Sequence, residues 1–345
     1  MCIRDRLVYF RIEDKNPPRS DLEKLSGLYN SGDLTAVKSF CDVLLAAHPH
    51  SAIVYNVLGV ALEGQGNLED SLVAYETAAE KDPNHLDSCH NAAILLGRLG
   101  RFEEAKDKYN IIVDLAPDDA DARNNLGVVL QNLNEHSSAV KHFQKAVVLE
   151  PRNSSAFFNY ANSLKELGES DKALENYDHS LRINPSFFLA HNNRGSLLEM
   201  MGRDEEARKS YSIAINLKPN YFTAYSNRGG VEKRLGNYPE AASDLCKALE
   251  LDPWKPEDSS EVTNYKFRLQ VSLGDIQMYL GQYEKALDSY ESATAIEPEN
   301  KDLPAFKGNA LAGLGKLSEG LKLRQKSFGF NLGRIVAAVS EYADK

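Results

Sequence analysis

The stretch ADARNNLGVVLQNLNEHSSAVKHFQKAVVLEPRN, residues 120–153, decides the fold. Apolar residues recur at helical spacing over about fourteen residues before Asn134, and again from Glu135 to Leu149. Asn134 separates the two stretches with a residue that tolerates left-handed backbone angles. Pro151 ends the second stretch, because the residue before a proline disfavours helical angles. The stretch therefore predicts a helix, a tight turn and a second helix.

The same unit recurs along the chain at a constant period. Prolines mark its end at Pro49, Pro83, Pro117, Pro151, Pro185, Pro219 and Pro253. Glycines stand at its turn, where positive φ is expected, at Gly32, Gly66, Gly100, Gly168, Gly202 and Gly236, with Asn134 in the remaining place. Polar residues just beyond the prolines are expected to cap the next helix: Asn84, Asp118, Asn153, Ser186 and Asn220. A repeat array therefore replaces the two or three globular domains that the chain length alone suggests.

Two columns of small residues and one of aromatic residues share this period. The small residues are Gly59, Ala93, Gly127, Ala161, Gly195 and Gly229 in the first helix, and Ser71, Ala105, Ala139, Ala173, Ala207 and Ala241 in the second. The aromatic column is Tyr75, Tyr109, Phe143, Tyr177 and Tyr211, continued by Leu245 and Tyr290. Helices cross closely only where side chains are small, so we interpret these columns as helix contacts and core.

With small residues at repeat positions 8 and 20, an aromatic at 24 and proline at 32, the pattern resembles the tetratricopeptide repeat, whose units are about 34 residues long. The resemblance covers residues 18–330 and implies an all-α fold, a superhelix of about nine helix-turn-helix repeats. The repeats begin at Pro18, Ala52, Leu86, Ala120, Ser154, Phe188, Phe222, Phe267 and Lys301. The first and ninth are degenerate, as capping repeats are.

Three segments depart from the period. Residues 1–17 are expected to be a leader, and the first six, MCIRDR, resemble the translation of a transposase-end adapter used in sequencing libraries. An insertion at residues 256–266 is expected to be a tolerated loop or a first helix lengthened by about three turns, with a docking feature as the alternative. Residues 331–345 are expected to form a capping helix or to begin a truncated domain.

Composition excludes several classes of function. A net charge of -10 without a basic stripe argues against nucleic acid as a partner. No apolar run approaches the ~20 residues of a membrane helix, and the four scattered cysteines favour a reducing, cytoplasmic setting. No histidine pair has the spacing of a zinc enzyme, and no nucleotide or nucleophile motif is present. We therefore expect no catalysis, no metal and no cofactor.

One polar column is the candidate binding site. In the tetratricopeptide family, positions 2, 5, 6, 9, 12 and 13 of the first helix face a concave groove, and position 6 here is Asn91, Asn125, Asn159, Asn193 and Asn227. Asn56, Asn124 and Asn192 at position 5, with Asn162 at position 9, widen the track. An amide has two N–H donors and one acceptor oxygen, so it can pair with the backbone of an extended peptide.

The column resembles the asparagine ladder in the tetratricopeptide arm of O-linked N-acetylglucosamine transferases. The alternative is that these asparagines belong to the general consensus of the repeat and serve helix packing or water contacts without a ligand. The expected function is a non-catalytic scaffold that binds an extended segment of a protein or peptide partner. A second hypothesis is the substrate-recruiting N-terminal arm of a larger glycosyltransferase, sulfotransferase or oxygenase. A third is self-association through the terminal repeats.

Overall fold

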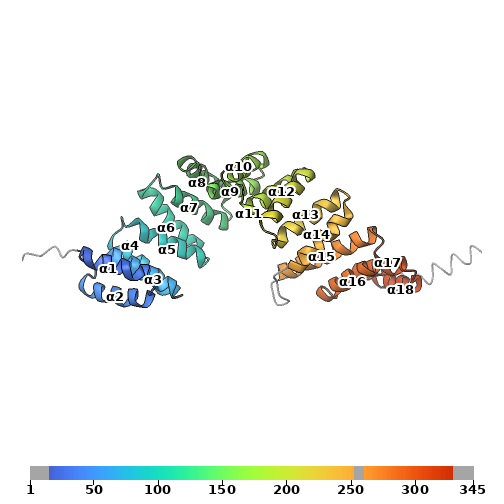
Figure 1. The fold of residues 1–345 in the computed structure, drawn as a ribbon, viewed down its shortest axis with the longest axis horizontal. Coiled ribbons are helices and arrows are strands. Elements are labelled where there is room, and N and C mark those ends of the chain that lie inside the picture. Colours follow the sequence, from blue (N-terminus) through green and yellow to red (C-terminus); the bar gives the residue numbers. More distant parts are fainter. Residues whose placement is uncertain (1–14, 252–259, 329–345) are drawn as a thin grey trace, which may run out of the picture. The chain divides into compact units, whose positions relative to one another are not determined.

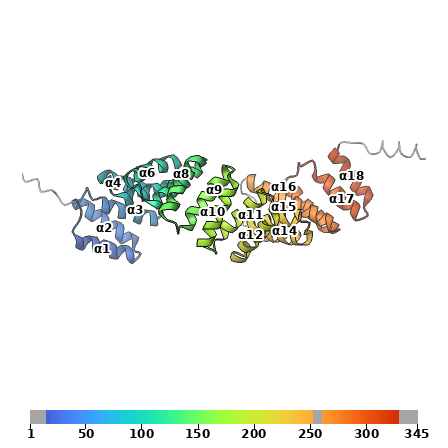
Figure 2. The same ribbon diagram turned by 90° about the horizontal axis from the view of Figure 1, so that it is seen from above.

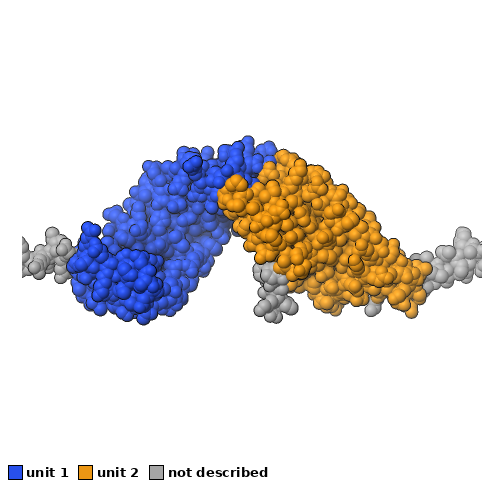
Figure 3. Space-filling model, viewed as in Figure 1, with its two compact units in different colours: residues 1–183 blue, residues 184–345 orange. Residues whose placement is uncertain are grey.

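The computed structural model describes residues 15–251 and 260–328, which form 18 α-helices and no β-strand (Figure 1). The chain divides into two units, residues 1–183 and 184–345, coloured separately in Figure 3. Unit 1 contains α1 (Arg19–Asn30), α2 (Leu34–Ala47), α3 (Ala52–Gly64), α4 (Leu68–Lys81), α5 (Leu86–Arg98), α6 (Phe102–Leu115), α7 (Ala120–Asn132), α8 (His136–Leu149), α9 (Ser154–Glu166) and α10 (Ser170–Ile183). Unit 2 contains α11 (Phe188–Met200), α12 (Asp204–Leu217), α13 (Phe222–Arg234), α14 (Tyr238–Leu251), α15 (Ser260–Tyr279), α16 (Tyr283–Ile296), α17 (Leu303–Gly313) and α18 (Leu317–Phe328).

The helices form hairpins, and within each unit consecutive hairpins stack side by side (Figure 2). Each odd-numbered helix after α1 packs most extensively against the helix that follows it and, where the preceding hairpin belongs to the same unit, more lightly against that hairpin. Six predicted repeat starts coincide with the first residue of a helix, from Ala52 at α3 to Phe222 at α13. The predicted all-α solenoid of about nine helix-turn-helix repeats is thus confirmed.

The turn inside each hairpin has the predicted backbone conformation. Gly66 has φ of 84° and Asn134 has φ of 59°, the one non-glycine residue with positive φ in the described part of the chain. Side chains rarely adopt such angles, and asparagine tolerates them better than most. This explains why asparagine stands at this position where the glycine is missing.

The predicted helix caps were mostly wrong by one residue. Asn153 does cap α9, accepting from the N–H of Ala156 at 3.0 Å. The residue after Asn84 and the residue after Asp118 are the actual caps of their helices, and α11 and α13 begin after Phe187 and Tyr221 without a side-chain cap. In the four wrong cases the turn after the proline takes one more residue than the prediction allowed.

The small column and the aromatic column meet inside each repeat. A Cβ atom added to Gly59 would lie 2.5 Å from the ring of Tyr75, and one added to Gly127 would lie 2.6 Å from the ring of Phe143. Both rings are buried, with at most 1% of their surface exposed. Glycine in the first helix therefore lets the aromatic ring of the second helix lie against its backbone.

The ends and the insertion are described only in part. The predicted leader is outside the described residues as far as residue 14, and the predicted capping helix or truncated domain at 331–345 lies outside them altogether. Of the insertion at 256–266, residues 260–266 belong to α15, which has 20 residues against 13 in α13. The described part of the insertion is therefore helical and adds about two turns to the first helix of its repeat.

Candidate functional site

The candidate asparagines lie on the first helices of their repeats, and several of their side chains hydrogen-bond to one another. Asn91 donates through Nδ2 to Oδ1 of Asn56 at 2.9 Å, which joins α5 to α3. Asn159 donates in the same way to Asn124 at 3.2 Å, and Asn124 donates to Asn125 at 3.2 Å. The polar column of unit 1 is therefore bridged between α3 and α5 and between α7 and α9, an arrangement that the sequence alone did not reveal.

Unit 2 repeats this arrangement. Asn227 on α13 donates to Oδ1 of Asn192 on α11 at 3.2 Å, and Asn192 donates to Asn193 at 3.3 Å. Asn192 is buried, whereas the other position-6 and position-5 asparagines are half-buried. Each bridging amide uses one N–H group laterally, and an amide also has a second N–H and two lone pairs.

Asn162, the position-9 candidate, has a different environment. Its Oδ1 accepts from the O–H of Tyr177 at 2.5 Å, within the same repeat. Tyr177 is a buried member of the aromatic column. At least one role of Asn162 is thus to satisfy the hydroxyl of a core tyrosine, as buried polar groups require.

Three adjoining pockets follow the first helices of unit 1. Pocket A has a volume of about 370 Å³ and is lined by Leu22, Leu25, Ser26, Tyr29, Ile53, Val57 and Val60. Pocket B has a volume of about 600 Å³ and is lined by Tyr29, Leu34, Val60, Glu63, Gly64, Tyr75, Asn91 and Arg98. Pocket C has a volume of about 490 Å³ and is lined by Ala93, Ile94, Gly97, Arg98, Phe102, Tyr109, Asn125, Val128, Val129 and Asn132.

The shared lining residues make these pockets one row, which we call the unit 1 groove. Tyr29 and Val60 line both A and B, and Arg98 lines both B and C. Two candidate residues lie in it, Asn91 in pocket B and Asn125 in pocket C. Most of its lining residues lie on the first helices α1, α3, α5 and α7, and Leu34, Tyr75, Phe102 and Tyr109 come from second helices.

An ion pair crosses pocket B. Glu63 on α3 forms an ion pair with Arg98 on α5, and its other oxygen accepts from the O–H of Tyr75 at 2.9 Å. Burial, and then the hydrogen bond with Glu63, raise the pKa of Tyr75 well above its ordinary value. Tyr75 therefore stays a neutral donor across the physiological pH range.

The same triad occurs in unit 2. Glu199 on α11 pairs with Arg234 on α13 at 2.9 Å and accepts from the O–H of Tyr211 at 2.9 Å. Arg234 also forms an ion pair with Asp204 at 2.8 Å. Neither triad was predicted from the sequence, although the members of the second stand at the same repeat positions as those of the first, four repeats later.

Polar side chains also lie in and near pocket C, around the hydroxyl of Tyr109 and the imidazole of His90. Burial raises the pKa of Tyr109 to about 12, and a hydrogen bond with Asn125 partly offsets this effect. The imidazole of His90 lies edge-on to the ring of Tyr109 with ring centres 6.2 Å apart, and its Nε2 pairs with Oδ2 of Asp119 at 2.9 Å. His90 is therefore tied to the start of α7.

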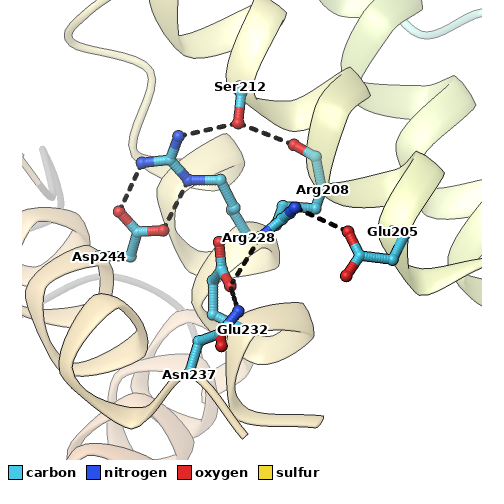
Figure 4. A network of polar contacts seen from close by, with 7 residues as sticks. All are labelled: Glu205, Arg208, Ser212, Arg228, Glu232, Asn237 and Asp244. Atoms are coloured by element: carbon cyan, nitrogen blue, oxygen red, sulfur yellow. Dashed lines mark hydrogen bonds and ion pairs between the residues drawn. The ribbon is translucent and has the colours of Figure 1, made fainter. Parts of the chain in front are cut away.

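The second unit contains a partly buried ionic network in which the carboxylates of Asp244 and Glu232 are the buried groups (Figure 4). Arg228 on α13 makes two hydrogen bonds of 2.7 Å to Asp244 on α14 and one of 3.0 Å to Ser212 on α12. The Ser212 hydroxyl in turn donates to the carbonyl of Arg208 at 2.8 Å. Glu232 accepts from Asn237 at 2.6 Å and lies 3.9 Å from the guanidinium of Arg208. Such a network fixes three helices relative to one another and has a structural role.

The part of the chain that the structure describes was searched for metal-binding clusters and for membrane-spanning helices. No group of three or more His, Cys, Asp or Glu side chains within residues 15–251 and 260–328 is arranged to hold a metal ion. None of the helices in that part of the chain is long and apolar enough to span a membrane.

Comparison with known proteins agrees with the repeat pattern. Family models described as tetratricopeptide repeat match residues 35–85, 90–156, 142–175, 222–253 and 267–300, and one described as TPR repeat matches 161–202. Together they span more than half of the chain. No curated protein matches the sequence significantly.

Solved structures share the fold at low sequence identity. A tetratricopeptide repeat protein from Parabacteroides merdae is 21% identical with a TM-score of 0.55, covering 75% of this chain and 98% of that one. Pseudomonas aeruginosa PilF is 21% identical with a TM-score of 0.52, covering 59% of this chain and 93% of its own. YrrB, described as a TPR protein with an unusual peptide-binding site, is 24% identical with a TM-score of 0.47, covering 53% of this chain and 95% of its own.

Proposed function

Because the chain belongs to the tetratricopeptide repeat family, we propose that it is a non-catalytic scaffold whose unit 1 groove binds an extended segment of a partner protein. The observation that carries this proposal is the row of three adjoining pockets, with Asn91 and Asn125 among its lining residues. Ligand sites are concave and mostly apolar, with a few polar groups that set orientation. The groove has this composition.

The asparagines suit the backbone of the bound segment. Each amide has hydrogen-bonding positions beyond its lateral bond, so Asn91, Asn125 and Asn159 can each engage about two groups of a peptide backbone. At ~0.5–1.5 kcal/mol per hydrogen bond this contributes about 3–9 kcal/mol, less ~2–5 kcal/mol for ordering the segment. The backbone contacts alone therefore support weak binding, and the pockets add side-chain contributions.

Selection of phage-displayed twelve-residue peptides on the whole chain tests the proposal. Enriched peptides are then assayed in solution against the double variant Asn91→Ala with Asn125→Ala. Asn110→Ala on the exposed side of α6 is the matched control. We expect the double variant to weaken binding at least ~10-fold, which is the effect of losing two or more hydrogen bonds, while the control changes nothing. Enriched peptides that bind the double variant as tightly as the parent would overturn the proposal.

A further inference from the structure

The lateral asparagine bonds occur at alternate junctions between first helices. Position 5 is asparagine only in alternate repeats, since the column reads Leu22, Asn56, His90, Asn124, Phe158, Asn192 and Ser226. The asparagine at position 6 of the following repeat donates to it, which bridges α3 to α5 and α7 to α9 in unit 1, and α11 to α13 in unit 2. We call these three the closed junctions.

A second bridge reinforces each closed junction from position 12. Glu63 pairs with Arg98 between α3 and α5, and Glu199 pairs with Arg234 between α11 and α13. Between α7 and α9, Gln131 donates through Nε2 to the carbonyl of Asn159 and to the hydroxyl of Ser163, both at 2.8 Å. The backbones of the helices at all three junctions lie close together.

The other two junctions of unit 1 are open. They lie between α1 and α3 and between α5 and α7. Leu22 occupies position 5 at the first, and His90 at the second is bound to Asp119 at 2.9 Å. Neither residue supplies an amide, and the contact between His90 and Asp119 joins α5 only to the residue that caps α7.

The pockets follow this alternation. Pockets A and C lie at the open junctions, where apolar side chains such as Val57 and Val128 line them. Pocket B lies across the closed junction between α3 and α5 and contains Asn91 with the Glu63–Arg98 pair. Along unit 1 the groove is therefore apolar, then polar, then apolar, with two repeats between the apolar pockets.

We propose that the unit 1 groove selects an extended peptide that carries two large apolar side chains six residues apart, one in pocket A and one in pocket C. The proposal rests on the proposed function and specifies its ligand. Packed helices lie ~8–10 Å apart, so two repeats span roughly 16–20 Å, which an extended chain crosses in about five or six residues at ~3.3 Å each. Side chains of an extended segment alternate between faces, so two that enter the same groove are an even number apart.

The charge of the protein around pocket C indicates which residues the bound peptide carries at its other positions. Asp87 and Asp121 are exposed at position 2 of α5 and α7, the helices that flank pocket C. Neither forms an ion pair within 4 Å among the described residues, whereas Arg98 in the groove is neutralised by Glu63. With a net charge of -10 for the chain, the complementary ligand is a segment whose polar positions are lysine or arginine.

Synthetic peptides test the spacing without altering the protein. Two phenylalanines are placed five, six or seven residues apart in an otherwise lysine- and serine-containing twelve-residue peptide, with a single-phenylalanine peptide as reference. Binding to the whole chain is followed by fluorescence anisotropy. We expect the six-residue spacing to bind ~10- to 100-fold more tightly than the other three, which is the effect of burying one further large apolar side chain.

Variants of the protein assign each side chain to its pocket. Val57→Lys in pocket A and Ile94→Lys in pocket C should each weaken binding of the peptide with the six-residue spacing. Its affinity should fall to that of the single-phenylalanine peptide. Val43→Lys, on the 64% exposed side chain of α2, is the control that should have no effect. Circular dichroism confirms that each variant is folded.

The outcomes separate this inference from the proposed function. Peptides that bind in an Asn91- and Asn125-dependent way but with equal affinity at all three spacings would overturn the two-pocket register and leave the scaffold function standing. Absence of any asparagine-dependent peptide binding would overturn both. Tighter binding at six residues that Val57→Lys and Ile94→Lys each abolish would support the inference.

Discussion

Two adjacent glycines in α13 allow a test of how closely the paired helices approach. A Cβ atom on Gly229 would lie 2.8 Å from Cδ2 and 3.0 Å from Cγ of Leu245, and 3.3 Å from Cβ of Asp244. A Cβ atom on Gly230 would have no neighbour within 4 Å. The substitutions Gly229→Ala and Gly230→Ala therefore add the same methyl group to the same helix, once against the core and once into open space.

The expected magnitudes differ because only one of the two sites is filled. Alanine in the interior of a helix is more favourable than glycine by ~1 kcal/mol, and both variants gain this contribution. Leu245 is only 2% exposed, so the methyl group of Gly229→Ala overpacks a filled site at a cost of ~1–3 kcal/mol. We expect Gly230→Ala to stabilise by ~1 kcal/mol, and Gly229→Ala to be neutral or to destabilise by up to ~2 kcal/mol.

Urea unfolding followed by far-ultraviolet circular dichroism measures the difference. Repeat arrays can unfold in several steps, so the comparison requires equal slopes of the transition in the two variants and the parent. A difference of ~1–3 kcal/mol between the variants is expected. If their free energies of unfolding agree within ~0.5 kcal/mol, the range typical of substitutions that disturb no packing, the close approach of α13 to α14 does not explain the glycine column.

Three further predictions concern ionisable groups. Asp244→Ala should destabilise the protein by about 2–4 kcal/mol in chemical denaturation, because Arg228 loses the partner of its two shortest hydrogen bonds. Replacing Asp244 with leucine and Arg228 with methionine in the same chain should recover most of the loss. Cys41 is buried, and burial raises the pKa of its thiol to about 12, whereas Cys246 is exposed. Because the thiolate is the reactive form, iodoacetamide at pH 8.5 should modify Cys246 at least ~10-fold faster than Cys41, as measured by peptide mass spectrometry. Burial, followed by nearby cations, lowers the pKa of His142 in the folded chain, so the unfolded chain binds the proton more readily and stability falls as pH decreases through about 6.5. His142→Gln should make the melting temperature depend less on pH between pH 7 and 5. An unchanged slope would show that other groups cause the loss of stability in this range.

Local sequence patterns predicted much of the fold, because helix periodicity and turn chemistry act over a few residues. The positive φ of Asn134 followed from its place in the glycine column, and the buried ring of Phe143 followed from the aromatic column. The helix caps were less predictable, since a shift of one residue in the turn after proline moves the cap past Asn84. Residue type alone does not resolve such a shift.

The candidate site was predictable as a column but not as a set of contacts. Asn91 and Asn125 were identified from their period, and both line pockets in unit 1. The bond between Asn91 and Asn56 depends on how far apart α3 and α5 lie, which the sequence of one helix does not encode. The ion pair between Glu63 and Arg98 was not predicted for the same reason, because its two members belong to different repeats.

Because closed and open junctions alternate, the unit that can be added or removed in protein engineering is a pair of repeats and not a single repeat. In a simple repeat array every interface has the same energy, so repeats are removed or added one at a time. Here deletion of a single repeat would place two closed junctions, or two open junctions, in succession. Removal of the repeat that begins at Ala120, for example, would leave the amide of Asn159 facing His90 in place of its acceptor Asn124. Shortened or lengthened versions of this scaffold should therefore be designed in steps of two whole repeats, which restores the same junction on both sides of the cut.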